Sequence, residues 1–261
     1  MNVKQVLRGT TALNLCGLWL GLRNRAARVY LSDCLRRYQE LAGLGLPHRD
    51  PRQFLVEQGW GAHEQHATLP TQTDLRGGVQ LDEMVIIATT TRILAPRKIF
   101  EIGTYNGQTT AVLVLNSPAD ARVLTMDLPP DVASTEGVTH IDLGLIANRE
   151  VGIRLKELGL QGRAEQVFCD SMAFDPSPHR GSVELGFIDG AHSRAFVEND
   201  TVKMADMMAE RGIVFWHDYR GQGALRPLGE YLESLARKIP IYSVHGTSLA
   251  WASAPDVRRI L

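Results

Sequence analysis

Apolar residues recur at helical spacing over roughly the first sixty positions, and a different pattern begins at about residue 79. The helical spacing is clearest in one group, Val29, Leu31, Leu35, Tyr38 and Leu41. A glycine- and proline-bearing stretch at 43–47 interrupts it, and 61–78 has the composition of a loop. We therefore expect an N-terminal helical extension with a linker over 1–78 and a second domain over 79–261.

Short apolar runs alternate with longer amphipathic stretches in the second domain. The runs expected to be strands are 98–102, 122–126, 164–168, 184–188, 212–216, 241–244 and 249–252. The stretches expected to be helices are 81–94, 108–116, 145–158, 195–208 and 225–238. This alternation predicts an α/β fold with a mostly parallel, seven-stranded sheet and helices on both faces. The short link at 245–248 predicts an antiparallel hairpin at one edge.

Composition narrows the range of functions. The chain has 261 residues, of which 44% are hydrophobic and 22% charged, and its net charge of -1 predicts no general attraction to nucleic acid. Residues 1–52 nevertheless hold nine Lys and Arg against three Asp and Glu. Such a charge run is usually a solvated helix surface. The alternative is a basic face that meets an acidic substrate, a partner or a membrane surface.

Three cysteines, Cys16, Cys34 and Cys169, are too few and too scattered for a disulfide framework or a zinc site. The apolar run at 13–22 is too short to span a bilayer and has no small-residue cleavage site after it. We therefore expect a cytoplasmic protein without stable membrane insertion. The apolar N-terminal helices would either pair two copies in a homodimer or pack on the core of their own chain.

The strongest chemical signal is the stretch 99–107, in which an apolar strand carries Glu101 and then runs through Gly103 and Gly107 into a helix. Ligands of open α/β sheets bind beyond the carboxyl ends of the strands, where glycine lets the backbone approach them closely. Tyr105 stands where a dinucleotide fingerprint needs its second glycine. A nicotinamide-dependent oxidoreductase is therefore disfavoured.

Acids also follow the next two strands. Asp127 comes about twenty residues after the glycine turn, where a carboxylate typically accepts hydrogen bonds from both hydroxyls of a ribose. Asp170 and Ser171 follow the third strand and suit an adenine amino group. Both places also allow a plain structural role, because Asp and Ser cap helices and turns routinely.

Two aspartates and two histidines, Asp189, His192, His217 and Asp218, follow the fourth and fifth strands. A lone histidine is usually structural, but four such residues at neighbouring strand ends are expected to share one crevice. A histidine there could remove a proton from a substrate, because its pKa lies near neutrality. The aspartates could orient the histidines or bind a cation.

In this order and spacing, 101–107, 127, 170–171, 189–192 and 217–218 resemble class I S-adenosylmethionine-dependent methyltransferases. More narrowly, the chain resembles the bacterial group of macrocin-type O-methyltransferases and cephalosporin-hydroxylase-like proteins, to which 125–130 and 246–250 are also similar. The resemblance covers about 79–252 and implies a Rossmann-like fold. It implies S-adenosyl-L-methionine as the cofactor, with these binding residues: Glu101, Gly103, Tyr105, Gly107, Asp127, Asp170, Ser171 and Asp189.

Within that set, the resemblance implies that Glu101 binds the methionine amino group, directly or through water. Some relatives also bind a divalent metal such as Mg²⁺ through acids at the ends of the fourth and fifth strands, where Asp189 and Asp218 stand. The chain has His217-Asp218-Tyr219 where the metal-dependent catechol-type enzymes carry a paired Asp-Asn. This departure argues against metal dependence.

The expected reaction is O-methylation of a small-molecule hydroxyl of the natural-product or sugar type, with His192 or His217 as base beside Asp218. The loop 128–145, together with Tyr105 and the N-terminal helices, would form the acceptor-side wall. The alternatives are N-methylation of a small amine and a non-catalytic S-adenosylmethionine-binding protein. Nucleobases are disfavoured as acceptors, because the chain has no Asn/Asp-Pro-Pro-Tyr motif.

Overall fold

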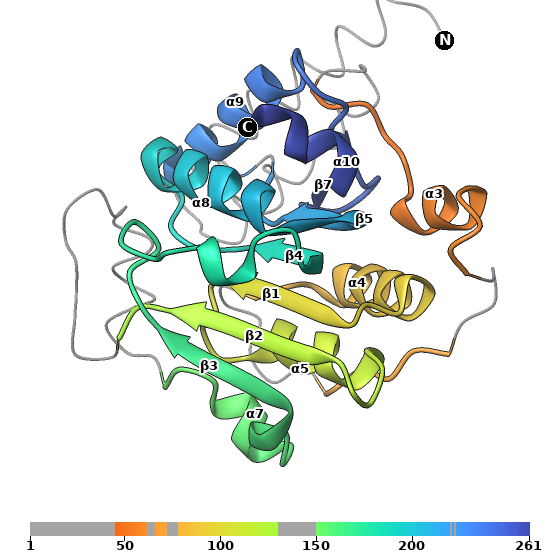
Figure 1. Cartoon of the computed structure of the whole chain (residues 1–261), viewed down its shortest axis with the longest axis vertical. Coiled ribbons are helices and arrows are strands. Elements are labelled where there is room, and N and C mark those ends of the chain that lie inside the picture. The colour runs from red at the N-terminus through yellow and green to blue at the C-terminus, as the bar shows by residue number, and fades with distance from the viewer. Residues whose placement is uncertain (1–44, 62–65, 72–77, 130–149, 220, 222) are drawn as a thin grey trace, which may run out of the picture. The chain divides into compact units, whose positions relative to one another are not determined.

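Seven strands in the described part of the chain form one sheet, in the order β3-β2-β1-β4-β5-β7-β6 (Figure 1). The strands are β1 (Lys98–Ile102), β2 (Arg122–Asp127), β3 (Ala164–Phe168), β4 (Val183–Ile188), β5 (Met208–Trp216), β6 (Tyr242–Ser243) and β7 (Ala250–Ser253). The first five run parallel, and β7 is antiparallel to both β5 and β6. The predicted Rossmann-like sheet and its edge hairpin are therefore confirmed.

The coordinates are a computed structural model that describes residues 45–61, 66–71, 78–129, 150–219, 221 and 223–261. Residues 46–261 make up one compact unit. The expected N-terminal helices, the 13–22 run, Cys16, Cys34 and most of the 128–145 loop lie outside the described residues. The domain boundary at 78/79 and the homodimer stay predictions.

Helices cover both faces of the sheet. One hydrophobic core contains residues of α3 (Pro51–Glu57), α4 (Leu81–Leu94) and α5 (Gln108–Asn116), and the other contains residues of α8 (Arg194–Met207), α9 (Arg226–Leu235) and α10 (Ala254–Val257). The short α7 (Ile153–Glu157) follows the undescribed loop. Single 3-10 turns lie at Gln161–Arg163, Ser177–His179, Gly223–Leu225 and Arg258–Ile260. None of the described helices is long and apolar enough to cross a membrane.

The parallel strands are apolar on both faces because helices bury both. In β1, Ile99 belongs to the core shared with α4 and α5, whereas Phe100 and Ile102 belong to the core shared with α8. Successive strand side chains point to opposite faces, so a near-continuous apolar run is what a doubly covered strand requires. Glu101 breaks this run with a carboxylate that is completely buried.

Most predicted boundaries agree with the structure to within a few residues, with two corrections. The helix predicted from 145 begins at Ile153, because 150–152 are not helical and Gly152 has a φ of 72°. Its predicted residues 145–149 lie outside the described residues. The strand predicted at 212–216 begins at Met208, directly after α8 ends at Met207. The pairing of Val183 with Met208 explains this early start.

A buried hydrogen bond between Trp216 of β5 and Thr201 of α8 is expected to contribute to the stability of the fold. Trp216 Nε1 donates to Thr201 Oγ1 at 3.0 Å, and both residues are completely buried. Thr201→Val keeps the side-chain shape but leaves the indole without this acceptor. We expect the free energy of unfolding, measured by urea denaturation, to fall by about 1–3 kcal/mol. The control Val202→Thr, on the exposed side of α8, should change it by less than about 0.5 kcal/mol. Equal effects of both substitutions would contradict the expectation.

Candidate active site

Backbone hydrogen bonds continue one residue past the ends of the parallel strands and draw the following loops together. The N–H of Gly103 donates to Met126 O at 2.8 Å, and the N–H of Cys169 donates to Asp127 O at 2.9 Å. The N–H of Asp189 donates to Ile102 O at 2.8 Å, and the N–H of His217 donates to Ile188 O at 3.0 Å. Every predicted site residue except Glu101 thus stands at or just after the carboxyl end of a strand. This edge is where open α/β sheets bind ligands.

The glycine turn after β1 packs closely on the loop after β4. Gly103 has a φ of 99°, and a Cβ there would lie 1.9 Å from the carbonyl oxygen of Asp189. Gly107 has a φ of 85° and caps the N-terminus of α5. Tyr105 also has a positive φ, 47°, and its N–H donates to Asp127 Oδ2 at 2.7 Å. Leu128 N donates to Asp127 Oδ1 at 2.7 Å, so the acid of β2 fixes both loops.

Glu101 is a buried carboxyl group at the centre of this edge, with 0% of its surface exposed. Its Oε2 accepts hydrogen bonds from Thr110 Oγ1 at 2.5 Å and Thr125 Oγ1 at 2.6 Å. Its Oε1 has no hydrogen-bond partner among the described residues. Burial raises the pKa of Glu101 to about 8, against the opposing threonine hydrogen bonds and with the help of the charges of Asp189 and Asp127.

The loop after β3 has both a structural role and an open apolar surface. Asp170 Oδ1 accepts from Met172 N at 2.9 Å, as a turn-capping aspartate does. The carbonyl oxygen of Ser171 accepts from Lys203 Nζ at 2.6 Å, which ties the loop to α8. Phe168 and Met172 are each 47% exposed. Sequence reasoning missed these two apolar side chains, although each stands within two residues of a predicted cofactor residue.

The predicted aspartates and histidines do converge, and they form a continuous hydrogen-bonded cluster. His192 Nε2 lies 3.0 Å from Asp218 Oδ2. His217 Nδ1 lies 3.2 Å from Asp189 Oδ1 and 3.5 Å from Asp218 Oδ1. Asp218 has a φ of 59°, an unusual backbone conformation that occurs here where its carboxylate reaches both histidines.

A further carboxylate, Glu83 of α4, completes the cluster and was missed by sequence reasoning. Its Oε2 lies 3.1 Å from His217 Nε2 and accepts from Gln80 N at 2.8 Å. Its Oε1 accepts from Ser248 N at 2.7 Å and Ser248 Oγ at 2.6 Å. The only local signal was a glutamate at the third position of a helix, which usually indicates nothing beyond capping.

The carboxylates around His217 decide its protonation. Burial lowers the pKa of His217, but the charges and hydrogen bonds of Asp189 and Asp218 outweigh it and raise this pKa well above the ordinary value. Burial likewise raises the pKa of Asp218, but the charge of His217 and the hydrogen bonds from both histidines bring it far below normal. His217 is thus an imidazolium that already holds its proton. The geometry favours His192 over His217 as a base.

The same residues bear on the predicted metal site. One ligand atom each from Asp189, His192 and Asp218 lies within 4.8 Å of the others, a spacing that a cation could bridge. However, the nearest oxygens of both aspartates face His217, and the second oxygen of Asp218 faces His192. The carboxylate oxygens that could bind a metal therefore point at the two imidazoles. The positive charge of His217 already neutralises both aspartates, which disfavours a divalent cation beside them.

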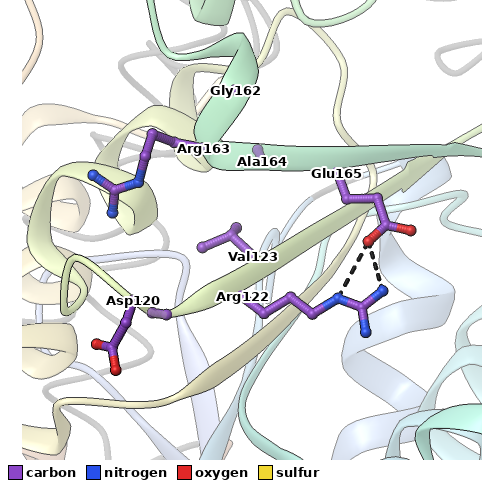
Figure 2. Close-up of a pocket in the computed structure, with 8 residues that line it drawn as sticks. Asp120, Arg122, Val123, Gly162, Arg163, Ala164 and Glu165 are labelled. Carbon is purple, nitrogen blue, oxygen red and sulfur yellow. Dashed lines mark hydrogen bonds and ion pairs between the residues drawn. The ribbon is translucent and has the colours of Figure 1, made fainter.

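A shallow hollow lies at the opposite end of the sheet. It is lined by 120–123 and 162–165, at the amino ends of β2 and β3. Figure 2 shows Arg122 and Glu165 across it, joined by an exposed ion pair of 2.7 Å. The side chains that we place at the candidate site are absent from this lining. The amino ends of parallel strands are not where such sheets bind ligands, so we assign it no role.

Comparisons with known proteins agree with the position of the site. Residues 100–219, which run from β1 to just beyond β5, match the family described as a methyltransferase domain. A search of curated proteins finds no match to the sequence. The fold resembles that of a methyltransferase from Podospora anserina with bound SAH, with a TM-score of 0.53 and 15% identity over 84% of this chain and 92% of that one.

A cofactor-bound protein from MTB is similar at a TM-score of 0.51 and 15% identity, over 78% of this chain and 88% of that one. At 15% identity the two structures show similarity of fold alone. The family match shows a methyltransferase domain over residues 100–219. The chain therefore contains a methyltransferase domain, and its fold is similar to that of a methyltransferase with bound SAH.

From the raised pKa of Glu101 we predict that the stability of the protein depends on pH. Between the ordinary glutamate pKa of 4.5 and the folded value of about 8, the folded chain binds more protons than the unfolded chain, so its stability falls as pH rises through this range. Glu101→Gln cannot ionise. Its free energy of unfolding, relative to wild type, should therefore increase by roughly 3–5 kcal/mol between about pH 5 and pH 9.

Denaturant titrations at both pH values measure this change, and Glu198→Gln on the exposed side of α8 is the matched control. The difference between the control and wild type should not depend on pH. A pH-independent difference for Glu101→Gln as well would show that Glu101 is already ionised in the folded protein.

Proposed function

We propose that this methyltransferase transfers the methyl group of S-adenosylmethionine to a hydroxyl oxygen of a small molecule. The main support for the proposal is that two features lie at the same edge of the sheet. A buried carboxyl group with an unpartnered oxygen, Glu101, lies beneath the glycine turn. A histidine–aspartate pair, His192 and Asp218, lies at the next strand ends. The first suits a cationic cofactor, and the second suits a proton acceptor.

The residues at the edge suit S-adenosylmethionine in several respects. Glu101 Oε1 is a buried acceptor without a donor, and the ammonium group of the cofactor would supply one. Asp127 is held by backbone N–H groups on both sides, and a carboxylate oxygen accepts more than one hydrogen bond, so it could also take ribose hydroxyls. We assign Asp170 and Ser171 to the adenine end, with Phe168 and Met172 as apolar surface beside it.

The chemistry needs alignment and a proton acceptor. When bound, S-adenosylmethionine supplies an electrophilic methyl carbon on a sulfonium, and the hydroxyl oxygen attacks that carbon in line with the departing sulfur. The new bond is O–CH₃, and S-adenosylhomocysteine leaves. The hydroxyl proton passes to His192, whose Nε2–H donates to the ionised Asp218 and whose lone pair then lies on Nδ1.

His192 and Asp218 favour oxygen over nitrogen as the methyl acceptor. A neutral amine attacks through its own lone pair and needs no base for that step, whereas an alcohol is a weak nucleophile until it loses its proton. N-methylation of a small amine remains the second candidate. The narrower resemblance to macrocin-type enzymes points to sugar and natural-product hydroxyls as the first acceptors to test.

Transfer of a ¹³C-labelled methyl group tests the proposal. We expect S-adenosylmethionine labelled at its methyl carbon to give O-methyl products from a panel that contains catechol, methyl glucoside and benzylamine. His192→Asn should reduce turnover by about 10²–10⁴-fold because the proton acceptor is lost. His66→Asn is the control, at an exposed histidine that is not part of the cluster. Product spectra that show methyl on nitrogen, or full turnover by His192→Asn, would contradict the proposal.

A further inference from the structure

Glu83 reaches the His–Asp cluster from a helix that precedes every strand of the sheet in the sequence. It stands in the first turn of α4 and is 2% exposed. Burial raises the pKa of Glu83, but the hydrogen bonds and charge around it, chiefly from His217, bring this pKa down to about 2. A carboxylate that is both buried and ionised is expensive unless donors surround it.

The donors around Glu83 come from three separate parts of the chain. Gln80 N lies at the start of the same helix, Ser248 in the link between β6 and β7, and His217 at the end of β5. Ser248 contributes both its N–H and its hydroxyl group. Glu83 therefore joins the helix layer, the edge hairpin and the site. Helix capping alone would need only the bond from Gln80.

The bond to His217 determines what the imidazole can do. Its Nε2 faces Glu83 Oε2 at 3.1 Å, and its Nδ1 faces Asp189 Oδ1 at 3.2 Å. A neutral imidazole has one N–H and would turn a lone pair toward one of these carboxylates. Both contacts are attractive only when both ring nitrogens carry hydrogen. Carboxylates on opposite sides of the ring thus fix its orientation and its two protons together.

The fixed ring in turn places the residues next to the proposed methyl acceptor. His217 Nδ1 contacts Asp189 and Asp218, and the other oxygen of Asp218 contacts His192 Nε2. A rotation of the His217 ring would withdraw a donor from both aspartates at once. The side chain of Asp218 would then lose one of the two imidazoles that hold it against His192.

We propose that Glu83 is a positioning residue for methyl transfer, which clamps His217 in its doubly donating form and thereby orients Asp189, Asp218 and His192. This inference rests on the proposed function for its link to turnover. Its structural part, the clamped His217, is independent of which acceptor is used. Glu83 does not touch the reacting atoms and acts only through His217.

Glu83→Gln in the full chain tests the proposal, because glutamine still caps a helix at this position but carries no charge. The first readout is the set of His217 ring N–H signals in ¹⁵N NMR near neutral pH. Wild type should show two slowly exchanging ring protons, and the variant should lose the one on Nε2. The second readout is kinetic, with S-adenosylmethionine and catechol as the probe pair. Turnover should fall about 10–100-fold with little change in the KM for S-adenosylmethionine.

Asp82→Asn is the matched control, since it removes an exposed carboxylate from the same helical turn. It should keep both His217 signals and its turnover. A single ring N–H on His217 in wild type would overturn the proposal, as would a Glu83→Gln protein with both signals and full turnover. If wild type fails to methylate catechol, the imidazole signals decide alone. Failure of the proposed function would appear separately, as no binding of S-adenosylmethionine to wild type.

Discussion

The N–H of Asp189 donates to the carbonyl of Ile102, and the N–H of His217 donates to the carbonyl of Ile188. These two bonds extend the parallel ladder of β1, β4 and β5 beyond the strands, and the site depends on them. They bring the loops after three strands into contact without a covalent link or a metal. Gly103 makes the closest approach, since a Cβ at that position would lie 1.9 Å from the Asp189 carbonyl. The positions of Asp189, His192, His217 and Asp218 therefore follow from strand order and register, whereas their chemistry follows from the side chains that the loops carry.

Within the arrangement of loops, the charges of His217 and the surrounding carboxylates determine the protonation of the site residues. His217 is surrounded by Glu83, Asp189 and Asp218, and it stays protonated because their combined attraction exceeds the cost of its burial. The same imidazolium keeps Asp218 ionised, which suits Asp218 to accept a hydrogen bond from His192. One buried cation thus distinguishes the two histidines in the proposed mechanism, in which His217 is a fixed donor and His192 is the proton acceptor. Burial raises the pKa of Glu101, and its Oε1 has no hydrogen-bond partner among the described residues, which suits a cationic ligand.

The sheet and most site residues could be predicted because their signals are local. An acid or a glycine stands at the end of each of the five parallel strands or within two residues after it, and the carboxyl ends of these strands meet at one edge. Glu101, Asp127 and the His217-Asp218 pair could therefore be placed from the sequence. Glu83 could not, because it contacts His217 across 134 positions and looks like an ordinary capping residue. The different protonation of His192 and His217 could not be predicted from the sequence either, since it depends on how many carboxylates face each ring. The start of α7 was predicted too early, because Gly152 adopts a left-handed conformation and caps a helix that begins only at Ile153.

We propose that S-adenosylmethionine binds at the carboxyl edge of the sheet, with its ribose on Asp127. Calorimetric titration of wild type with S-adenosylmethionine and S-adenosylhomocysteine measures this most directly, together with Asp127→Asn and Asp120→Asn. Asp120 lies in the hollow at the other end of β2, so its variant should bind as wild type does. Asp127→Asn should weaken binding of both ligands by about tenfold or more, the loss expected for a charged acceptor. No binding to wild type, or equal binding by all three proteins, would contradict this binding site.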